Sequence, residues 1–493
     1  MSFEVVTRVA RIYICNIDMQ TQHERARRRV CKIDRPPRPQ WTAEVRNPRV
    51  VRRVLARPSA IPRAFFGLFV LGLSFPGDVQ TQQRASVAIP NDALVVMGGP
   101  VITGTGEAPI PNGIVVIQGE RILTVGPAAD YTVPQGVSIV DARGGSIMPG
   151  LINSHIHHGA PPELRHRFLV GGVTTVCDLG SALDEIPQFL EEDCSDGPAA
   201  RGLRAGPIVT APGGYPDGLY GTHINYEVAR PDDAPGAITD LVERGVDMVK
   251  IAIDPSWNVE QPLPILELDV VRAIVREAHA HGRLVRAHVI QPPHLDLAIE
   301  GGVDVIEHVG MPRWPSSEEE QKVMASDDPV GVFFDRWAPD YQPRLERMVA
   351  RGIAMVPTVS ALLGGFYTAS DPTPRQSWVV DVVLDIIRRF HEAGGTVAVG
   401  NDFNDRSMRE RKPLLEMEML LEAGLSPMDV IVAGTRNAAR VCGREGDLGT
   451  LEPGKLADVI VVDGDPLSDL VGTLGRVVTV VRGGVVAGDL PGN

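Results

Sequence analysis

The sequence predicts an α/β protein whose main part is a barrel of eight parallel strands, accompanied by a smaller β-rich unit. Strand-like and helix-like patterns alternate from about residue 147 to about residue 440. Several of the strand-like runs end in a Lys, His or Asp, and parallel barrels carry their chemistry at the C-terminal strand ends. Short β-rich runs with turns flank the barrel region on both sides.

Residues 1–50 are rich in Arg and Pro and show no periodic apolar pattern, which is typical of a disordered segment. Residues 1–63 carry fifteen Lys and Arg against five Asp and Glu, a net charge of +10, which leaves −24 for residues 64–493. We expect translation to start near Val50 or Val51, so that residues 1 to about 50 are not made.

A twelve-residue apolar run from Ala64 to Phe75 follows a group of four arginines, Arg52, Arg53, Arg57 and Arg63. Twelve residues are too few to span a bilayer but suit the hydrophobic part of a secretory signal. We predict a signal peptide over residues 51–80, no stable membrane span, and a periplasmic or secreted protein. The alternatives are an uncleaved membrane anchor or a basic arm, on a protein that is membrane-anchored or cytoplasmic.

Residues 90–147 and 446–493 are expected to form the smaller unit together. The steps Gln118-Gly-Glu-Arg and Arg482-Gly-Gly each separate two β-rich runs and predict hairpins. Between these two segments, residues 148–445 are expected to form the barrel.

The barrel segment opens with the strand-like run that ends in His155-Ile-His157. Residues i and i+2 of a strand point to the same face, so both imidazoles can hold one metal ion. A His-x-His pair alone is a weak signal, and such histidines are more often surface or core residues.

Four further polar residues each end a short apolar run that suggests a buried parallel strand: Lys250, His288, His308 and Asp402. A buried charge is costly unless it is paired or bound to metal. Between the runs lie helical patterns, such as Leu268 to His279 with apolar residues at spacings of three and four. The alternatives are a surface lysine at 250, hydrogen-bonded core histidines at 288 and 308, and a helix cap at 402.

The composition fits a large enzyme that acts on small molecules. The hydrophobic fraction of 43% is ample for a core, and the net charge of −14 argues against nucleic acid as a partner. Of the five cysteines, Cys15 and Cys31 lie in the basic head, and Cys177, Cys194 and Cys442 are scattered. A disulfide scaffold is not expected, and Cys177 is interpreted as a core residue.

The order His-x-His, Lys, His, His, Asp resembles the binuclear-metal form of the amidohydrolase superfamily over roughly residues 92–488. Gly172-Val-Thr-Thr-Val-Cys-Asp-Leu-Gly is similar to its second strand, and Gly446-Asp-Leu-Gly-Thr-Leu-Glu-Pro-Gly-Lys-Leu-Ala-Asp to its C-terminal signature. The imidazolonepropionase-like, prolidase-related branch fits best, and Lys250 favours its two-metal members. The resemblance implies a (β/α)8 TIM-type barrel with a β-sandwich built from both ends of the mature chain.

The resemblance also implies a ligand set for two divalent metal ions, with zinc the natural choice for His and carboxylate ligands. His155, His157 and Asp402 would hold one ion, His288 and His308 the other, and Lys250 would bridge both as a carbamate. Two ions about 3.5 to 4 Å apart share a hydroxide and polarise a carbonyl, with Asp402 as general base and acid.

The implied function is hydrolysis of an amide bond in a small molecule such as a dipeptide, an N-acyl amino acid or a cyclic amide. A lactonase or esterase on the same metals is one alternative, and a non-catalytic binding barrel is another; a homo-oligomer is compatible with all three. Loop residues Tyr220, His223, Tyr226 and Arg375 are candidates for substrate contact. The dipeptidase-like relatives carry a Tyr where this chain reads Pro264-Ile-Leu, which speaks against a dipeptide.

Overall fold

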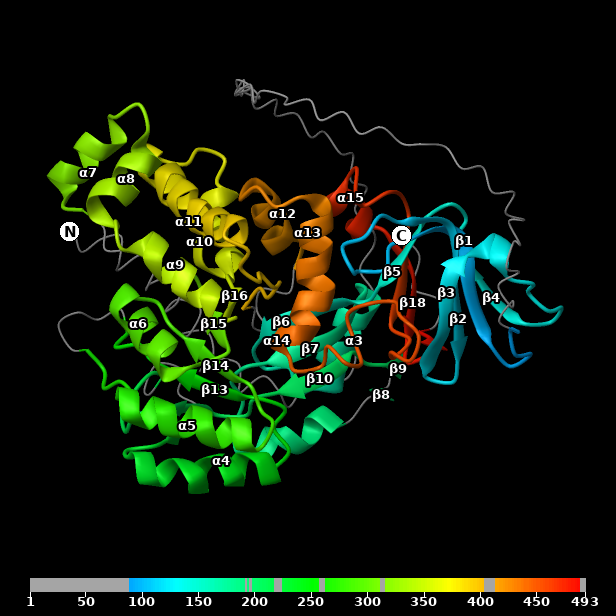
Figure 1. Ribbon diagram of the computed structural model, residues 1–493, viewed down its shortest axis with the longest axis horizontal. Helices are drawn as coiled ribbons and strands as arrows, with labels where there is room; N and C mark the ends of the chain where they lie inside the picture. Colours follow the sequence, from blue (N-terminus) through cyan, green and yellow to red (C-terminus); the bar gives the residue numbers. More distant parts are fainter. Residues whose placement is uncertain are drawn as a thin grey trace, which may run out of the picture. The chain divides into compact units, whose positions relative to one another are not determined.

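The computed structural model describes residues 88–190, 193–194, 197–216, 224–256, 262–310, 315–402 and 413–487 (Figure 1). The predictions for residues 1–50 and for a signal peptide over 51–80 fall outside these ranges. Within these ranges, no helix combines the length and the apolar character needed to cross a membrane.

Both ends of the described chain contribute to one eight-stranded sheet with the order β19-β18-β17-β5-β1-β2-β3, in which β4 also pairs with β1. Its strands are β1 (Leu94–Val101), β2 (Ile110–Gln118), β3 (Arg121–Pro127), β4 (Ser138–Asp141), β5 (Ser146–Pro149), β17 (Val459–Val462), β18 (Val477–Arg482) and β19 (Val485–Val486). The antiparallel pairing of β5 with β17 joins the two ends of the chain.

Both predicted hairpins are present in this sheet. Two residues separate β2 from β3, and Gly483 and Gly484 separate β18 from β19. The φ angles of Gly483 and Gly484 are +56° and +77°, a conformation that glycine adopts without steric cost in tight hairpin turns.

The middle of the chain forms two parallel sheets that alternate with helices. One has the order β10-β7-β6 and the other β12-β11-β13-β14-β15-β16. Their strands are β6 (Leu151–Ile156), β7 (Val173–Asp178), β10 (Arg201–Arg204), β11 (Ile208–Thr210), β12 (Asn225–Glu227), β13 (Val249–Ala252), β14 (Val285–His288), β15 (Val305–Glu307) and β16 (Ala354–Val356).

Residues 396–402, which the sequence suggests as a strand, make a single bridge from Val397 to Met355 of β16. This segment still connects the two parallel sheets, because the backbone N–H of Ser154 in β6 donates to the carbonyl of Val399. The same segment therefore contacts β16 on one side and β6 on the other.

Helices follow most strands of the parallel sheets, and Figure 1 shows α5 and α6 beside β13 and β14, with α4 on the outer side of α5. The helices in this part are α3 (Pro162–Val170), α4 (Ala234–Glu243), α5 (Leu268–Ala280), α6 (Pro292–Gly301), α7 (Ser317–Met324), α8 (Pro329–Trp337), α9 (Tyr341–Ala350), α10 (Val359–Tyr367), α11 (Pro374–Glu392), α12 (Leu414–Glu422), α13 (Pro427–Val432) and α14 (Ala438–Val441), and α15 (Leu470–Gly475) lies near the C-terminal end. The helix predicted over residues 268–279 is confirmed as α5.

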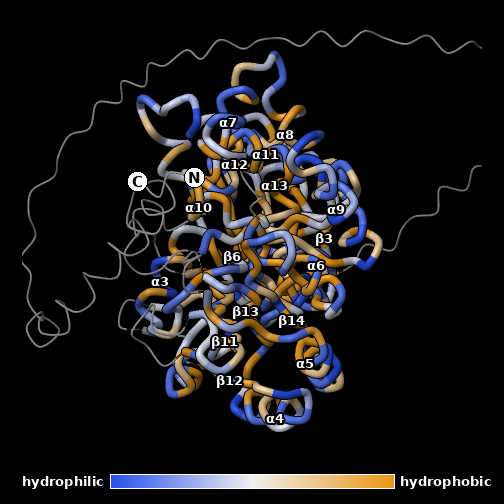
Figure 2. The backbone as a smooth tube through the Cα atoms, turned by 90° about the vertical axis from the view of Figure 1, so that its left-hand side faces the viewer, coloured by the Kyte–Doolittle hydropathy of each residue, from blue (hydrophilic) through white to orange (hydrophobic). Residues whose placement is uncertain are grey.

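The core lies between the parallel strands and these helices. On α5, Val270, Val271, Ile274 and Val275 are all buried, so its apolar face covers the sheet. Figure 2 shows the same distribution, with hydrophobic colouring along the inner strands and hydrophilic colouring on many outer turns. Against this apolar background, buried charged residues at the strand ends are conspicuous.

Candidate metal centre

The two histidines of the His-x-His pair stand at the end of β6 and point to the same side of the strand, as a period of two requires. The His155 side chain is buried, and the His157 side chain is 24% exposed. Gly400 permits this arrangement, because a Cβ there would lie 2.7 Å from the Cβ of His155. Only a residue without a side chain allows the segment to pass so close to β6.

Asp402 brings the two imidazoles together. Its Oδ1 lies 3.2 Å from Nε2 of His155 and 3.1 Å from Nε2 of His157. The Asp402 N–H donates to the carbonyl of His155, and the Asp402 backbone has a φ of +50°. These three side chains each offer one ligand atom within 4.8 Å of the other two, so they form a group that can hold a metal ion.

His288 at the end of β14 and His308 just after β15 form a second pair. Nδ1 of His288 lies 2.8 Å from Nε2 of His308, and both residues are buried. Nδ1 of His308 lies 3.9 Å from Asp402 Oδ2, so Asp402 stands between the two histidine pairs. His308 also has a positive φ, +71°, and such strained residues cluster at functional sites.

For three of the four histidines, one ring nitrogen lies within hydrogen-bond distance of a polar residue outside the ligand set. His155 Nδ1 is 2.7 Å from Oε2 of Glu307, His288 Nε2 is 2.9 Å from Oδ2 of Asp254, and His308 Nδ1 is 2.7 Å from Oγ1 of Thr358. An imidazole that donates on one side presents a lone pair on the other. The outer partners therefore aim His155 Nε2, His288 Nδ1 and His308 Nε2 at the centre.

Lys250 is the second of the four residues of β13, inside the strand rather than at its end. It is 1% exposed, which contradicts the alternative of a surface lysine, and within the described part of the chain its Nζ has no hydrogen-bond partner. Burial lowers the pKa of Lys250 to about 8. A fraction of the amine is therefore neutral near pH 7.4, the form that reacts with carbon dioxide.

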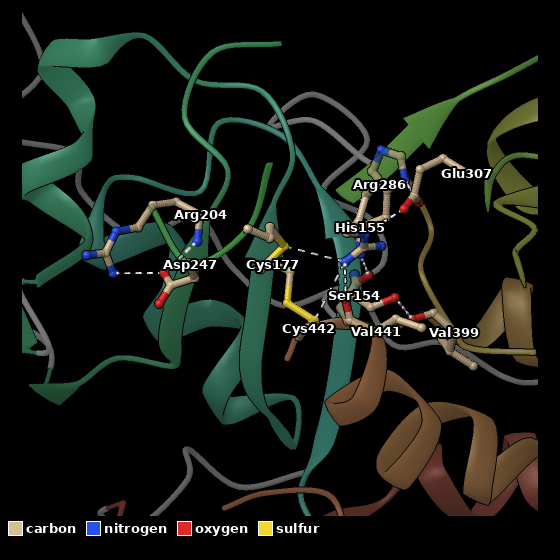
Figure 3. The surroundings of a disulfide bond; sticks show 12 residues. Ser154, His155, Cys177, Arg204, Asp247, Arg286, Glu307, Val399, Val441 and Cys442 are labelled. Atoms are coloured by element: carbon tan, nitrogen blue, oxygen red, sulfur yellow. Dashed lines mark hydrogen bonds and ion pairs between the residues drawn. A yellow bond between two sulfur atoms is a disulfide. The ribbon is translucent and has the colours of Figure 1, made fainter. Parts of the chain in front are cut away.

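Arg286 and Glu307 form a buried ion pair behind His155 (Figure 3). Arg286 Nε lies 2.6 Å from Oε1 of Glu307, whose other oxygen accepts from His155. Burial disfavours the charged carboxylate, but Arg286, Lys250 and His155 outweigh it and hold the pKa of Glu307 well below its usual value. Glu307 is therefore charged and accepts from His155 at any ordinary pH.

Cys177 and Cys442 form a disulfide beside this pair (Figure 3). The prediction that Cys177 is a core residue is confirmed, since it is fully buried, but its pairing across 265 residues was not foreseen. Nη1 of Arg286 lies 3.8 Å from Sγ of Cys442. The disulfide thus helps to pack the arginine that supports the histidine site.

Electrostatics keep Asp402 ionised. Burial raises the pKa of an isolated carboxyl, but His155, His157 and His308 outweigh this effect, and the pKa of Asp402 lies well below its usual value. Burial also opposes a charge on His157, but the hydrogen bond and charge of Asp402 prevail and raise the pKa of His157. Burial lowers the pKa of His288, and burial together with the neighbouring His288 lowers that of His308.

A buried glutamate lies behind Thr358. The oxygens of Glu416 accept from the N–H groups of Val359 and Ser360, the first two residues of α10, at 3.1 and 2.8 Å. Burial raises the pKa of Glu416 to about 7. Glu416 thereby anchors the start of the helix that follows Thr358, the partner of His308.

The structure does not bring the candidate substrate residues that it describes to the metal centre as it does the histidines. Tyr220 and His223 fall outside the described residues. The hydroxyl of Tyr226 donates to Asp240 of α4 at 3.2 Å, and Arg375 pairs with Glu320 of α7. Tyr226 and Arg375 thus tie elements of the fold together in the structure. Tyr215 instead stacks on His288, with ring centroids 4.4 Å apart.

The motifs in the sequence did not indicate the outer partners, especially Arg286, Glu307 and Asp254. A signal was available for the first two, because each interrupts an apolar strand run one or two residues before a candidate histidine. A charge at such a position needs a buried partner. Asp254 and Thr358 lie in loops, where no comparable signal exists.

Comparison with known proteins shows the family to which this chain belongs. A model of the amidohydrolase family matches residues 146–487. The ochratoxinase of Aspergillus niger is 25% identical over 484 residues, covering 85% of this chain and 92% of that protein. The imidazolonepropionase of Symbiobacterium thermophilum is 25% identical over 424 residues, covering 76% and 91%. The crystal structure of a Xaa-Pro dipeptidase with bound methionine has a TM-score of 0.63 and 23% identity, covering 80% of this chain and 100% of that one. The prediction of an enzyme with the amidohydrolase fold is confirmed, and the chain belongs to the amidohydrolase family.

Proposed function

We propose that the protein is a metal-dependent hydrolase that cleaves an amide C–N bond in a small molecule. The observation that carries this proposal is the convergence of His155 Nε2 and His157 Nε2 on one oxygen of Asp402, at 3.2 and 3.1 Å. Two imidazoles and a carboxylate are a donor set suited to zinc. The family assignment supports the same class of reaction.

The residues around this group suit two ions. His155, His157 and Asp402 would hold one, and His288 Nδ1 and His308 Nε2, which lie 2.8 Å apart, would hold the other. Lys250 would bridge them as a carbamate, because its buried amine lacks a hydrogen-bond partner among the described residues. A neutral lysine would otherwise bury an unsatisfied polar group in this apolar strand.

When bound, two such ions supply an activated water and polarise the carbonyl that it attacks. Asp402 takes the proton of the attacking water and returns it to the leaving nitrogen, so that the C–N bond breaks with a neutral amine as product. The low pKa of Asp402 means that its carboxylate is ionised and has a free lone pair for the proton, and its position between the histidine pairs would put it near both ions.

The experiment combines a metal count with turnover. Wild-type protein is expected to hold about two zinc ions per chain and to hydrolyse at least one member of a panel of dipeptides, N-acyl amino acids, cyclic amides and lactones. Asp402→Asn should abolish turnover on that substrate, while the exposed control Asp130→Asn keeps it. Wild-type protein that binds no zinc after reconstitution would defeat the proposal. Full turnover by Asp402→Asn would also defeat it. Turnover of lactones alone would favour the esterase alternative.

Lys250 has its own test. Lys250→Met should lower the metal content below two ions per chain, because a thioether cannot form the carbamate that joins them. Carbon-13-labelled bicarbonate should produce a carbamate signal in the NMR spectrum of the wild type that Lys250→Met lacks. A wild type with two ions and no such signal would remove the carbamate from the proposal.

We also propose that the two parallel sheets are parts of one closed (β/α)8 barrel and that the eight-stranded sheet is a β-sandwich. The bond from Ser154 N–H to Val399 supports closure at one side, and the bond from Asp247 N–H to the carbonyl of Arg204 supports it at the other. The domain limits would be 90–147 and 446–493 for the sandwich and 148–445 for the barrel. A crystal structure with an open gap between strands would contradict closure.

We further propose export to the periplasm or the outside of the cell, through the apolar segment in residues 51–80. The Cys177–Cys442 disulfide supports this location, because disulfides persist in oxidising compartments. Cell fractionation with N-terminal sequencing of the mature protein tests the proposal. A cytoplasmic protein whose N-terminus precedes residue 60 would refute it.

A further inference from the structure

One buried carboxylate, Asp254, holds His288 from behind. Asp254 lies two residues after the end of β13 and is 3% exposed. Its Oδ2 accepts from His288 Nε2 at 2.9 Å, and its Oδ1 accepts from the N–H of Ser256 at 2.8 Å. Ser256 has a φ of +71°, which closes the short turn that points this carboxylate at the imidazole.

The contact decides which nitrogen of His288 is available at the centre. With Nε2–H donating to Asp254, the lone pair of His288 is on Nδ1. That nitrogen lies 2.8 Å from Nε2 of His308, whose opposite nitrogen is bound to Thr358. Tyr215 stacks on the ring of His288 with an interplanar angle of 14° and restricts its tilt. His288 is thus fixed in position and in tautomer.

The other histidine pair depends on a different carboxylate. His155 is held by Glu307, whose charge is balanced by Arg286 at 2.6 Å. Among the described residues, no Lys or Arg forms an ion pair with Asp254; its oxygens are bound by His288 and by the Ser256 N–H. Two separate supports therefore stand behind the two histidine pairs.

From this arrangement we propose that Asp254 is a positioning residue for the second metal ion, the one that His288 and His308 would hold. The inference rests on the proposed two-metal function. It states that the binding of one ion depends on Asp254, a carboxylate that is not itself a ligand. Loss of such an outer carboxylate typically weakens metal binding about 10- to 100-fold. Asp254→Asn should therefore lower the affinity for one ion by this factor and leave the affinity for the other unchanged.

The test is a titration of chelator-treated protein with Co²⁺, followed by visible absorption and by ion count after equilibrium dialysis. Wild type should bind two ions. At a free Co²⁺ concentration that just fills both positions in the wild type, Asp254→Asn should hold one, with loss of part of the d–d absorption. Asp254→Glu keeps a carboxylate and should recover part of the lost affinity. A merely structural role would lower the melting temperature without this one-ion difference.

Glu277→Gln is the matched control, because Glu277 also pairs with an imidazole, that of His281 at 3.3 Å, on the protein surface. It should bind two ions as tightly as the wild type. Two ions of unchanged affinity in Asp254→Asn would overturn the inference alone. A wild type that binds no ion would overturn the proposed function and the inference with it. If Asp254→Asn does not fold, Asp254→Ser, which has no carboxylate, takes its place: loss of one ion supports the inference, and two ions of unchanged affinity overturn it.

Discussion

The buried Arg286–Glu307 pair gives a prediction whose size follows from the structure. Both side chains are 0% exposed, and Nε of Arg286 lies 2.6 Å from Oε1 of Glu307. Arg286→Met leaves Glu307 as a buried charge without its main partner, which costs about 3–5 kcal/mol. Replacing both residues, as in Arg286→Met with Glu307→Leu, removes both charges and should recover most of the loss.

This cost converts into a measurable shift. The described residues number roughly 370, and unfolding releases about 2.1 cal/mol/K per residue, or about 0.8 kcal/mol/K in all. A loss of about 4 kcal/mol then lowers the melting temperature by about 5 °C. Calorimetry of chelator-treated protein measures this shift without a contribution from bound metal.

The control is Arg244→Met, which breaks a surface pair with Asp240 whose side chains are 47% and 35% exposed. Exposed pairs contribute little, so the melting temperature of this variant should stay within error of the wild type. Equal shifts in Arg286→Met and Arg244→Met would refute the reasoning. A double variant as unstable as Arg286→Met would show that lost packing, and not the unpaired charge, causes the effect.

Three further predictions concern stability and the support of the site. Because the Cys177–Cys442 disulfide closes a loop of 265 residues, replacing both cysteines by Ala should cost about 5 kcal/mol in urea unfolding, and an unchanged midpoint would contradict this. Burial raises the pKa of Glu416 from 4.5 to about 7, so the native state keeps a proton that the unfolded state releases. The contribution of Glu416 to the stability of the metal-free protein should therefore fall by about 3 kcal/mol as the pH rises from about 4.5 to 7. Urea titrations at several pH values should show this difference in slope between the wild type and Glu416→Gln; an equal slope in the variant speaks against it. In Gly400→Ala the new Cβ would lie 2.9 Å from the backbone N of His155, so metal content should fall, whereas Gly236→Ala, which meets open space, should match the wild type; equal metal content in both variants excludes the clash.

Much of the fold was predictable because it follows local periodicity. The α5 pattern, the two glycine hairpins and the short apolar runs each express a repeat that is visible within about ten residues. The segment 396–402 was less predictable. It reads as a strand, but it pairs with β16 only through the Val397 bridge and reaches β6 through Val399.

Some residues of the candidate site were also predictable from local periodicity, and others were not. His155 and His157 share a face because of the strand period, and the structure brings His288, His308 and Asp402 to the same place. That Tyr220 and His223 contact the substrate stays a prediction. Tyr226, in contrast, is engaged with Asp240, because β12 packs near α4 in a way that no local pattern encodes.

The sequence by itself determined the residue types at the strand ends, since a charged or imidazole side chain in an apolar run has few roles besides metal binding or pairing. Only the tertiary structure decided what stands behind them: Glu307 and Arg286 at His155, Asp254 at His288, and the bond between cysteines 265 residues apart. These contacts join separate strands and loops, and their partners are chosen by chain packing and burial, which a single strand's pattern does not contain.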